Sequence, residues 1–271
     1  MADPTRSPSA VSIPGAVEGA FGVLWLAWRR AGPALLVASV CLGLWLQLGA
    51  AGAIGVKLLG LLIPCLACVA ATAAVCRVAL GLGGVTPRWG RDEWRVLASG
   101  VLMILLAVVL LMLLLVVVLA LAYGVASAGK GFVAGQTATW ASAVDGRGRV
   151  VVGAVALAGM AAIVWVMVRL FLAPAASVAR RRVQVLSVWS LTRGMAWRLA
   201  AVMVWVGLTP AALLLAIAAA SRLAPHDAVV LAWLAHLAQG LVVAAIWLPL
   251  KVGVMTYAYP RLAADSPIPS P

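Results

Sequence analysis

The stretch WRVLASGVLMILLAVVLLMLLLVVVLALAY, from Trp94 to Tyr123, decides the fold class of this chain. Beyond Arg95 it carries no charged residue, and a helix of about 20 apolar residues crosses the roughly 30 Å hydrocarbon core of a bilayer. Tryptophan prefers the headgroup region, and a neighbouring arginine can reach lipid phosphates. The stretch therefore predicts an interfacial anchor followed by a transmembrane helix.

The same anchor recurs twice, as Trp28-Arg29 and as Trp197-Arg198, and each time an apolar run follows it. A second apolar run follows each first one and carries a basic residue near its end, at Arg77, Arg169 and Lys251. This recurrence predicts three helical hairpins, residues 13–82, 83–174 and 175–260, between disordered tails at 1–12 and 261–271. The six spans are expected near Gly32–Gly52, Ile54–Leu80, Val96–Tyr123, Val150–Leu172, Met195–Ala220 and Val229–Ala258.

Composition supports lipid as the solvent of this chain. It is 65% hydrophobic and 10% charged, whereas soluble domains carry about 25% charged residues. The net charge of +13 is also typical of nucleic-acid-binding proteins. Here, however, the basic residues lie at the ends of apolar runs, which favours topology signals and contacts with anionic lipids. We expect an all-α, polytopic membrane helix bundle of six transmembrane helices, arranged as three hairpins with interfacial helices. Membrane lipids are the expected partners, a protein partner or a homo-oligomer is left open, and no nucleic acid is expected.

Three segments leave structural questions open. Pro14–Arg30 predicts a helix with one apolar stripe, which either lies in the membrane interface or continues into the first span. Pro210 predicts a kink or a break in the fifth span, because proline removes a backbone donor. Gly124–Arg149, rich in small residues, is typical of an ordered loop or a short re-entrant segment.

The distribution of basic residues predicts the orientation. Fifteen of the 20 lysines and arginines fall on the side that holds both termini, the 81–95 loop and the 173–194 segment. The positive-inside rule places that side, and both termini, in the cytoplasm. The Ala/Val/Gly/Arg-rich composition favours a bacterial inner membrane.

No motif predicts catalysis. Cys65-x-x-Cys68 has the spacing of a redox pair but lies in an apolar helix, where cysteine serves for packing, and His226 and His236 are too few for a metal site. Ser99 with His236 does not match an intramembrane serine protease, whose nucleophile lies on the fourth span. The seven carboxylates avoid the span centres, which disfavours ion-coupled carriers and acid-base hydrolysis. We expect no enzyme activity, cofactor or metal.

Basic residues at membrane depth are the remaining candidates for function. Arg77, Arg169 and Lys251, with Arg180, Arg181 and Arg182, either snorkel to the headgroups or converge on an anionic lipid phosphate, since no carboxylate is expected to neutralise them. The first hypothesis is a non-enzymatic membrane protein that organises or binds anionic lipid or a partner protein. The alternative is a channel or carrier for a small anionic or lipidic substrate.

The segment Ser187-Val188-Trp189-Ser190-Leu191-Thr192-Arg193-Gly194-Met195-Ala196-Trp197-Arg198, with Arg169-x-x-x-Ala173-Pro174 upstream, resembles a known family. It is similar to the bacterial six-helix family named after the glycerophosphoryl diester phosphodiesterase membrane domain. The resemblance implies a six-helix membrane domain. It implies no phosphodiesterase activity, because the acidic metal-binding residues of the catalytic barrel are missing here.

Overall fold

The computed structural model describes residues 11–51, 55, 60–83, 89–128, 146–223 and 229–264. These residues form helices joined by turns, with no strand among them. The elements are α1 (Ile13–Ala51), α3 (Leu62–Ala79), α4 (Arg91–Ser127), α6 (Gly146–Leu170), α7 (Ala173–Ala179), α8 (Ser187–Leu191), α9 (Ala196–Leu223), α10 (Val229–Leu241), η1 (Val242–Trp247) and α11 (Leu248–Ala264).

Six helical segments are long and apolar enough to cross a membrane. They are Ile13–Leu48, Leu62–Ala79, Arg91–Ser127, Gly146–Ala179, Ala196–Leu223 and Val229–Ala264. The predicted all-α class with six apolar helices of spanning length is therefore confirmed. Some of the predictions concern residues outside the described ranges. They are those for residues 1–10, the turn around residue 54, most of the 124–149 loop, His226 and residues 265–271.

The chain divides into two units, residues 101–169 and the remainder. The smaller unit holds most of α4 and α6, which meet at Gly159: a Cβ there would overlap the side chain of Leu114. Apolar side chains cover the outside of both helices, including Leu113, Val116, Leu157 and Val164, each at least half exposed. A helix pair that is apolar all round is stable in lipid and not in water.

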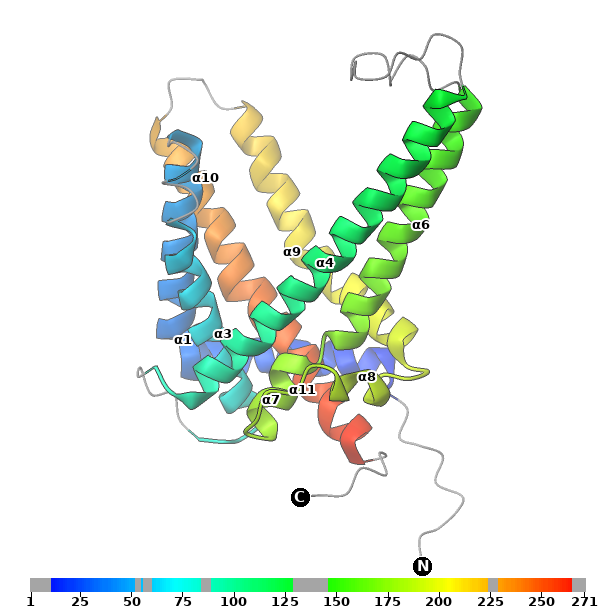
Figure 1. Ribbon diagram of the computed structural model, residues 1–271. Coiled ribbons are helices and arrows are strands. Elements are labelled where there is room, and N and C mark those ends of the chain that lie inside the picture. Colours follow the sequence, from blue (N-terminus) through cyan, green and yellow to red (C-terminus); the bar gives the residue numbers. More distant parts are fainter. Residues whose placement is uncertain are drawn as a thin grey trace, which may run out of the picture. The chain divides into compact units, whose positions relative to one another are not determined.

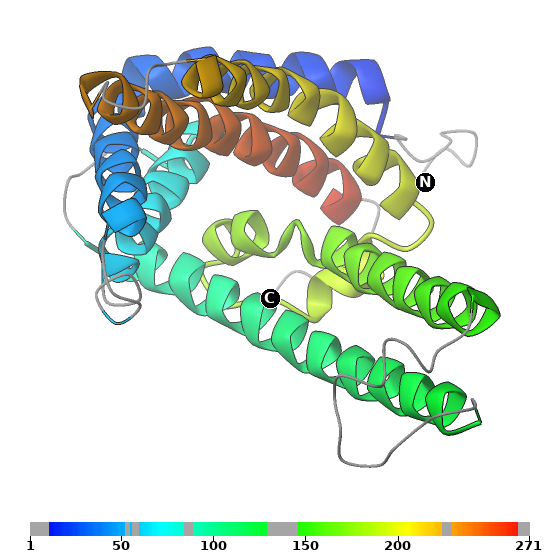
Figure 2. The ribbon, with the colours of Figure 1, turned by 90° about the horizontal axis from the view of Figure 1, so that it is seen from above.

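In the larger unit, α1 packs against α3, α9, α10, η1 and α11. It contains Pro33, and its first part lies crosswise to its second part in both views (Figure 1, Figure 2). A proline inside a helix removes a hydrogen bond and clashes with the preceding turn, which accounts for the bend. Pro14–Arg30 therefore continues into the first apolar run as one bent helix, and the placement of its crosswise part in the membrane interface stays a prediction.

Small residues hold the crosswise part of α1 against α11. Ala16 and Ala20 are fully buried, and a Cβ on Gly253 would lie 2.6 Å from the Cα of Ala20. Tyr257 fills the space above Gly15 and Gly19. Close backbone approach at small residues is the usual way in which helices associate in lipid, where the hydrophobic effect gives little attraction between them.

The sixth span departs from the α-helix where the sequence analysis expected no irregularity. Residues Val242–Trp247 form a π-helix just before Pro249. In an α-helix the carbonyl of Ala245 would accept a hydrogen bond from residue 249, which as proline has no N–H. The indole N–H of Trp28 donates to that carbonyl at 2.9 Å, so a side chain of α1 supplies a hydrogen-bond donor there.

The helix bounds bear on two further predictions. α9 runs through Pro210, so the break considered there is wrong and the alternative, a kink, stays a prediction. α11 continues through Pro260 to Ala264, so residues 261–264 are helical and do not belong to a disordered tail. The short helices α7 and α8 occupy the 173–194 segment, between α6 and α9.

A polar seam joins α1 to α10. A Cβ on Gly240 would overlap the carbonyl of Ser39 and lie 2.7 Å from the nitrogen of Gly43, so the two backbones touch there. One turn before Gly240, Nδ1 of His236 is hydrogen-bonded to Oε1 of Gln47. His236 on α10 is therefore hydrogen-bonded to a side-chain amide oxygen of α1.

Candidate functional site: the basic end of the larger unit

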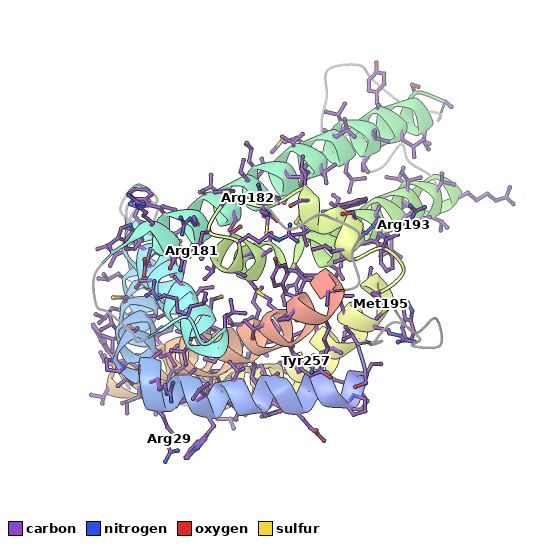
Figure 3. All side chains as sticks on the ribbon, turned by 90° about the horizontal axis from the view of Figure 1, so that it is seen from below. Arg29, Arg181, Arg182, Arg193, Met195 and Tyr257 are labelled. Carbon is purple, nitrogen blue, oxygen red and sulfur yellow. The ribbon has the colours of Figure 1, made fainter. Side chains whose placement is uncertain are left out.

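Arginines gather at one end of the larger unit, where α3 and α11 end, α4 and α9 begin, and α7 and α8 lie (Figure 1). We call this region the basic end. Arg29, Arg181, Arg182 and Arg193 are exposed on its surface and are seen together in the view from below (Figure 3). Arg222, in the last turn of α9, lies at the other end of that helix.

Arg77 is paired with carboxylates inside the basic end. Its Nη1 lies 2.7 Å from Oε1 of Glu93 and 3.7 Å from Oδ2 of Asp92. The Glu93 side chain is 3% exposed, and its Oε2 accepts a hydrogen bond from the N–H of Gly90 at 2.9 Å. Asp92 also pairs with Arg95 at 2.5 Å.

These pairs correct the expectation that no carboxylate is available to neutralise the basic residues at membrane depth. Asp92 and Glu93 stand in the first turn of α4, where the helix dipole favours negative charge. Arg77 stands in the last turn of α3, where the dipole favours positive charge. The sequence could have indicated this pairing, because a basic residue near the end of one predicted helix is followed by two acidic residues near the start of the next.

Lys251 differs from Arg77 in its surroundings. It is half-buried on α11, and its Nζ lies 5.9 Å from the ring centre of Phe171, the residue that follows α6. The fully buried Cys76 lies within electrostatic range of both Lys251 and Arg77. Within the part of the chain that the structure describes, Lys251 has neither a hydrogen bond nor a salt bridge. Its charge is therefore offset only by the Phe171 ring.

The Arg180–Arg182 triplet ends α7 in a fixed conformation. Nε of Arg180 donates to the hydroxyl of the buried Tyr259 at 2.8 Å. Arg181 has a φ of 53°, the left-handed conformation that terminates helices, and its side chain is exposed. The next turn is fastened by the N–H of Gln184, which donates to Oγ of Ser177 at 3.0 Å. The loop therefore presents Arg181 and Arg182 outward.

The three Trp-Arg pairs are not equivalent. Trp94 and Trp197 are 61% and 55% exposed, and the guanidinium of Arg198 lies 5.5 Å from the Trp197 ring centre. Trp28 instead uses its indole donor inside the bundle, on Ala245. The exposed aromatic of that helix is Trp25, with Arg29 5.6 Å from its ring centre. The sequence analysis missed Trp25 because it looked for tryptophan directly before arginine, whereas Trp25 lies four residues before Arg29 on the same helix.

Arg169 belongs to the smaller unit, and its convergence with Arg77 and Lys251 stays a prediction. All four cysteines are free, with Cys76 buried and Cys65 exposed on an apolar helix. Among the residues described, no group of three or more His, Cys, Asp or Glu side chains could hold a metal ion.

Comparisons of the chain with protein-family models, with curated proteins and with solved structures gave no match. The charges and contacts of the basic end therefore have to indicate the function.

Proposed function

We propose that this chain is a non-enzymatic integral membrane protein whose basic end binds or organises anionic lipid. One observation carries the proposal: the carboxylates Asp92 and Glu93 are paired with arginines, while Arg29, Arg181, Arg182 and Arg193 stay exposed. The charge left at this surface is positive, and exposed Trp residues accompany it. Arginine beside tryptophan at the end of apolar helices matches the chemistry of a lipid headgroup layer. A partner protein with an acidic surface would use the same residues.

The proposal includes three hairpins in a bacterial inner membrane with both termini in the cytoplasm. The hairpins are supported by the packing of α1 on α3, the meeting of α4 and α6 at Gly159, and the packing of α9 on α10. The orientation is supported by the excess of basic residues on one side. The resemblance of Ser187–Arg198 to a six-helix membrane family agrees with this topology.

Lipid retention tests the proposal. The triple variant Arg181→Gln/Arg182→Gln/Arg193→Gln removes three exposed charges, each worth about 1 kcal/mol of attraction to an anionic membrane surface. Purified from bilayers of mixed phosphatidylglycerol and phosphatidylcholine, it should carry fewer phosphatidylglycerol molecules in native mass spectrometry than the wild type. Arg222→Gln, at the other end of α9, is the matched control and should leave retention unchanged. Equal loss in both variants would refute a basic-end site.

Orientation is tested by cysteine labelling. A single cysteine placed at Ser127, at the end of α4, should react with an impermeant reagent added outside intact cells. One placed at Ser187, at the start of α8, should react only after the membrane is opened. Labelling in the reverse order would overturn the proposed topology.

A further inference from the structure

Lys251 lies at the level where two other helices of the bundle end. Its ammonium group approaches Phe171, directly after the end of α6, and its charge acts on Cys76, near the end of α3. Ends of spanning helices lie near the boundary between hydrocarbon and headgroups. A half-buried cation at this depth is within reach of a lipid phosphate.

The described carboxylates nearest to Lys251 already have cationic partners. Arg77 is paired with Glu93, and Arg95 with Asp92. Glu18, the other carboxylate among the described residues, is exposed on the crosswise part of α1. A desolvated ammonium group is costly unless an anion accompanies it, and the Phe171 ring supplies only a weak cation–π attraction.

We propose that Lys251 binds a singly charged phosphodiester, the headgroup chemistry of an anionic phospholipid such as phosphatidylglycerol. The inference rests on the proposed function and adds a site and a charge preference to it. A phosphodiester carries one negative charge and matches one ammonium group that has no acidic partner among the described residues, whereas a phosphomonoester carries close to two at neutral pH. Lysine binds phosphate as a compact point charge and needs no planar, bidentate partner.

Charge removal at position 251 is the first test. Wild type, Lys251→Met and Lys251→Arg are purified in detergent and titrated with an equimolar mixture of phosphatidylglycerol, phosphatidic acid and phosphatidylcholine. Native mass spectrometry counts the bound lipids. Losing one charge-assisted contact should weaken phosphatidylglycerol binding about tenfold in Lys251→Met. Lys251→Arg, which keeps the charge, should stay near the wild type, and equal unfolding midpoints show that all three proteins are folded.

Glu93→Gln is the second and more specific test. It keeps the shape of the side chain and an acceptor for Gly90, but it removes one negative charge and so raises the net charge around Lys251 by one. The variant should shift its preference from phosphatidylglycerol toward phosphatidic acid at pH 7.5. Adding Lys251→Met to Glu93→Gln should restore the preference for the monoanion. A lysine that only anchors the helix would produce neither shift.

The outcomes separate this inference from the proposed function. If the wild type retains no anionic lipid, both are wrong. If Lys251→Met binds phosphatidylglycerol as the wild type does while the triple arginine variant loses it, only the Lys251 site is refuted. Deacylated glycerophosphoglycerol serves as competitor: displacement of the lipid at equal concentration would assign the site to a soluble phosphodiester, and failure to displace it assigns the site to the lipid.

Discussion

Replacing Arg77 with methionine should destabilise the bundle more than any other removal of a single charge at the basic end. Arg77 and Glu93 lie 2.7 Å apart, with side chains 11% and 3% exposed. Methionine keeps most of the apolar stem of Arg77 but leaves the Glu93 carboxylate buried without a cation. Breaking a buried ion pair by removing one partner costs about 3–5 kcal/mol. The N–H of Gly90 still satisfies one oxygen of Glu93, so we expect a loss near the lower limit.

The partner substitution should cost less, and the double variant less than Arg77→Met alone. In Glu93→Gln the single amide oxygen can keep the hydrogen bond from Gly90, and Asp92, at 3.7 Å, remains as a carboxylate for Arg77. Weakening these hydrogen bonds costs about 1–2 kcal/mol. In Arg77→Met/Glu93→Gln no unpaired charge is buried, so the loss should fall below that of Arg77→Met.

The free energy of unfolding can be measured in mixed micelles by titration with a denaturing detergent, with secondary structure followed by circular dichroism. Arg91→Gln is the matched control, because it removes an exposed arginine from the first turn of α4, the turn that holds Glu93. A loss for Arg77→Met no larger than that for Arg91→Gln would refute the argument. So would a double variant whose loss equals the sum of the two single losses.

Two predictions concern the packing of α1. Gly240→Ala should lower the unfolding free energy by about 1–3 kcal/mol, because the new Cβ would overlap the backbone of α1 at Ser39. Gly22→Ala is the control: no atom lies within 4 Å of its new Cβ, so the unfolding free energy should stay unchanged or rise. Equal effects in the two variants would refute close contact at Gly240. Trp28→Phe keeps an aromatic ring but removes the N–H that donates to the carbonyl of Ala245. The unfolding free energy should fall by about 0.5–1.5 kcal/mol in the same assay. An unchanged unfolding free energy would mean that this hydrogen bond contributes nothing to stability.

The helices were predictable because their signal is local. A run such as Val96–Tyr123 has no alternative to a helix in lipid, since backbone polar groups there must be satisfied within the segment. Bounds were less certain, because helix propensity continues beyond the apolar run: α4 begins at Arg91 and ends at Ser127. The irregular helix was missed because Pro249 and Trp28 lie in different spans and act only once they meet.

The candidate site was only partly predictable, because charge pairing is a tertiary property. Counting carboxylates along the sequence showed that few exist, but it could not show that Glu93 turns inward to Arg77. The count also treated Arg77 and Lys251 as equivalent, although only one of them lies opposite the acidic turn that opens α4. Exposed arginines were easier to predict, since they lie in turns where solvent or headgroups are the default surroundings.

At the basic end, different charged residues stabilise the fold and attract anions. The Arg77–Glu93 pair joins the end of α3 to the start of α4, and the Arg95–Asp92 pair lies within the first turns of α4; the two pairs carry no net charge, so they hold the fold without attracting anions. Arg181, Arg182 and Arg193 are exposed and can be exchanged for glutamine without opening a buried pair. Lys251 lies between these classes, too buried to be an ordinary surface charge and without an acidic partner among the described residues. A ligand that brings its own negative charge would complete this position, which makes Lys251 the residue whose replacement should weaken lipid binding while the fold is kept.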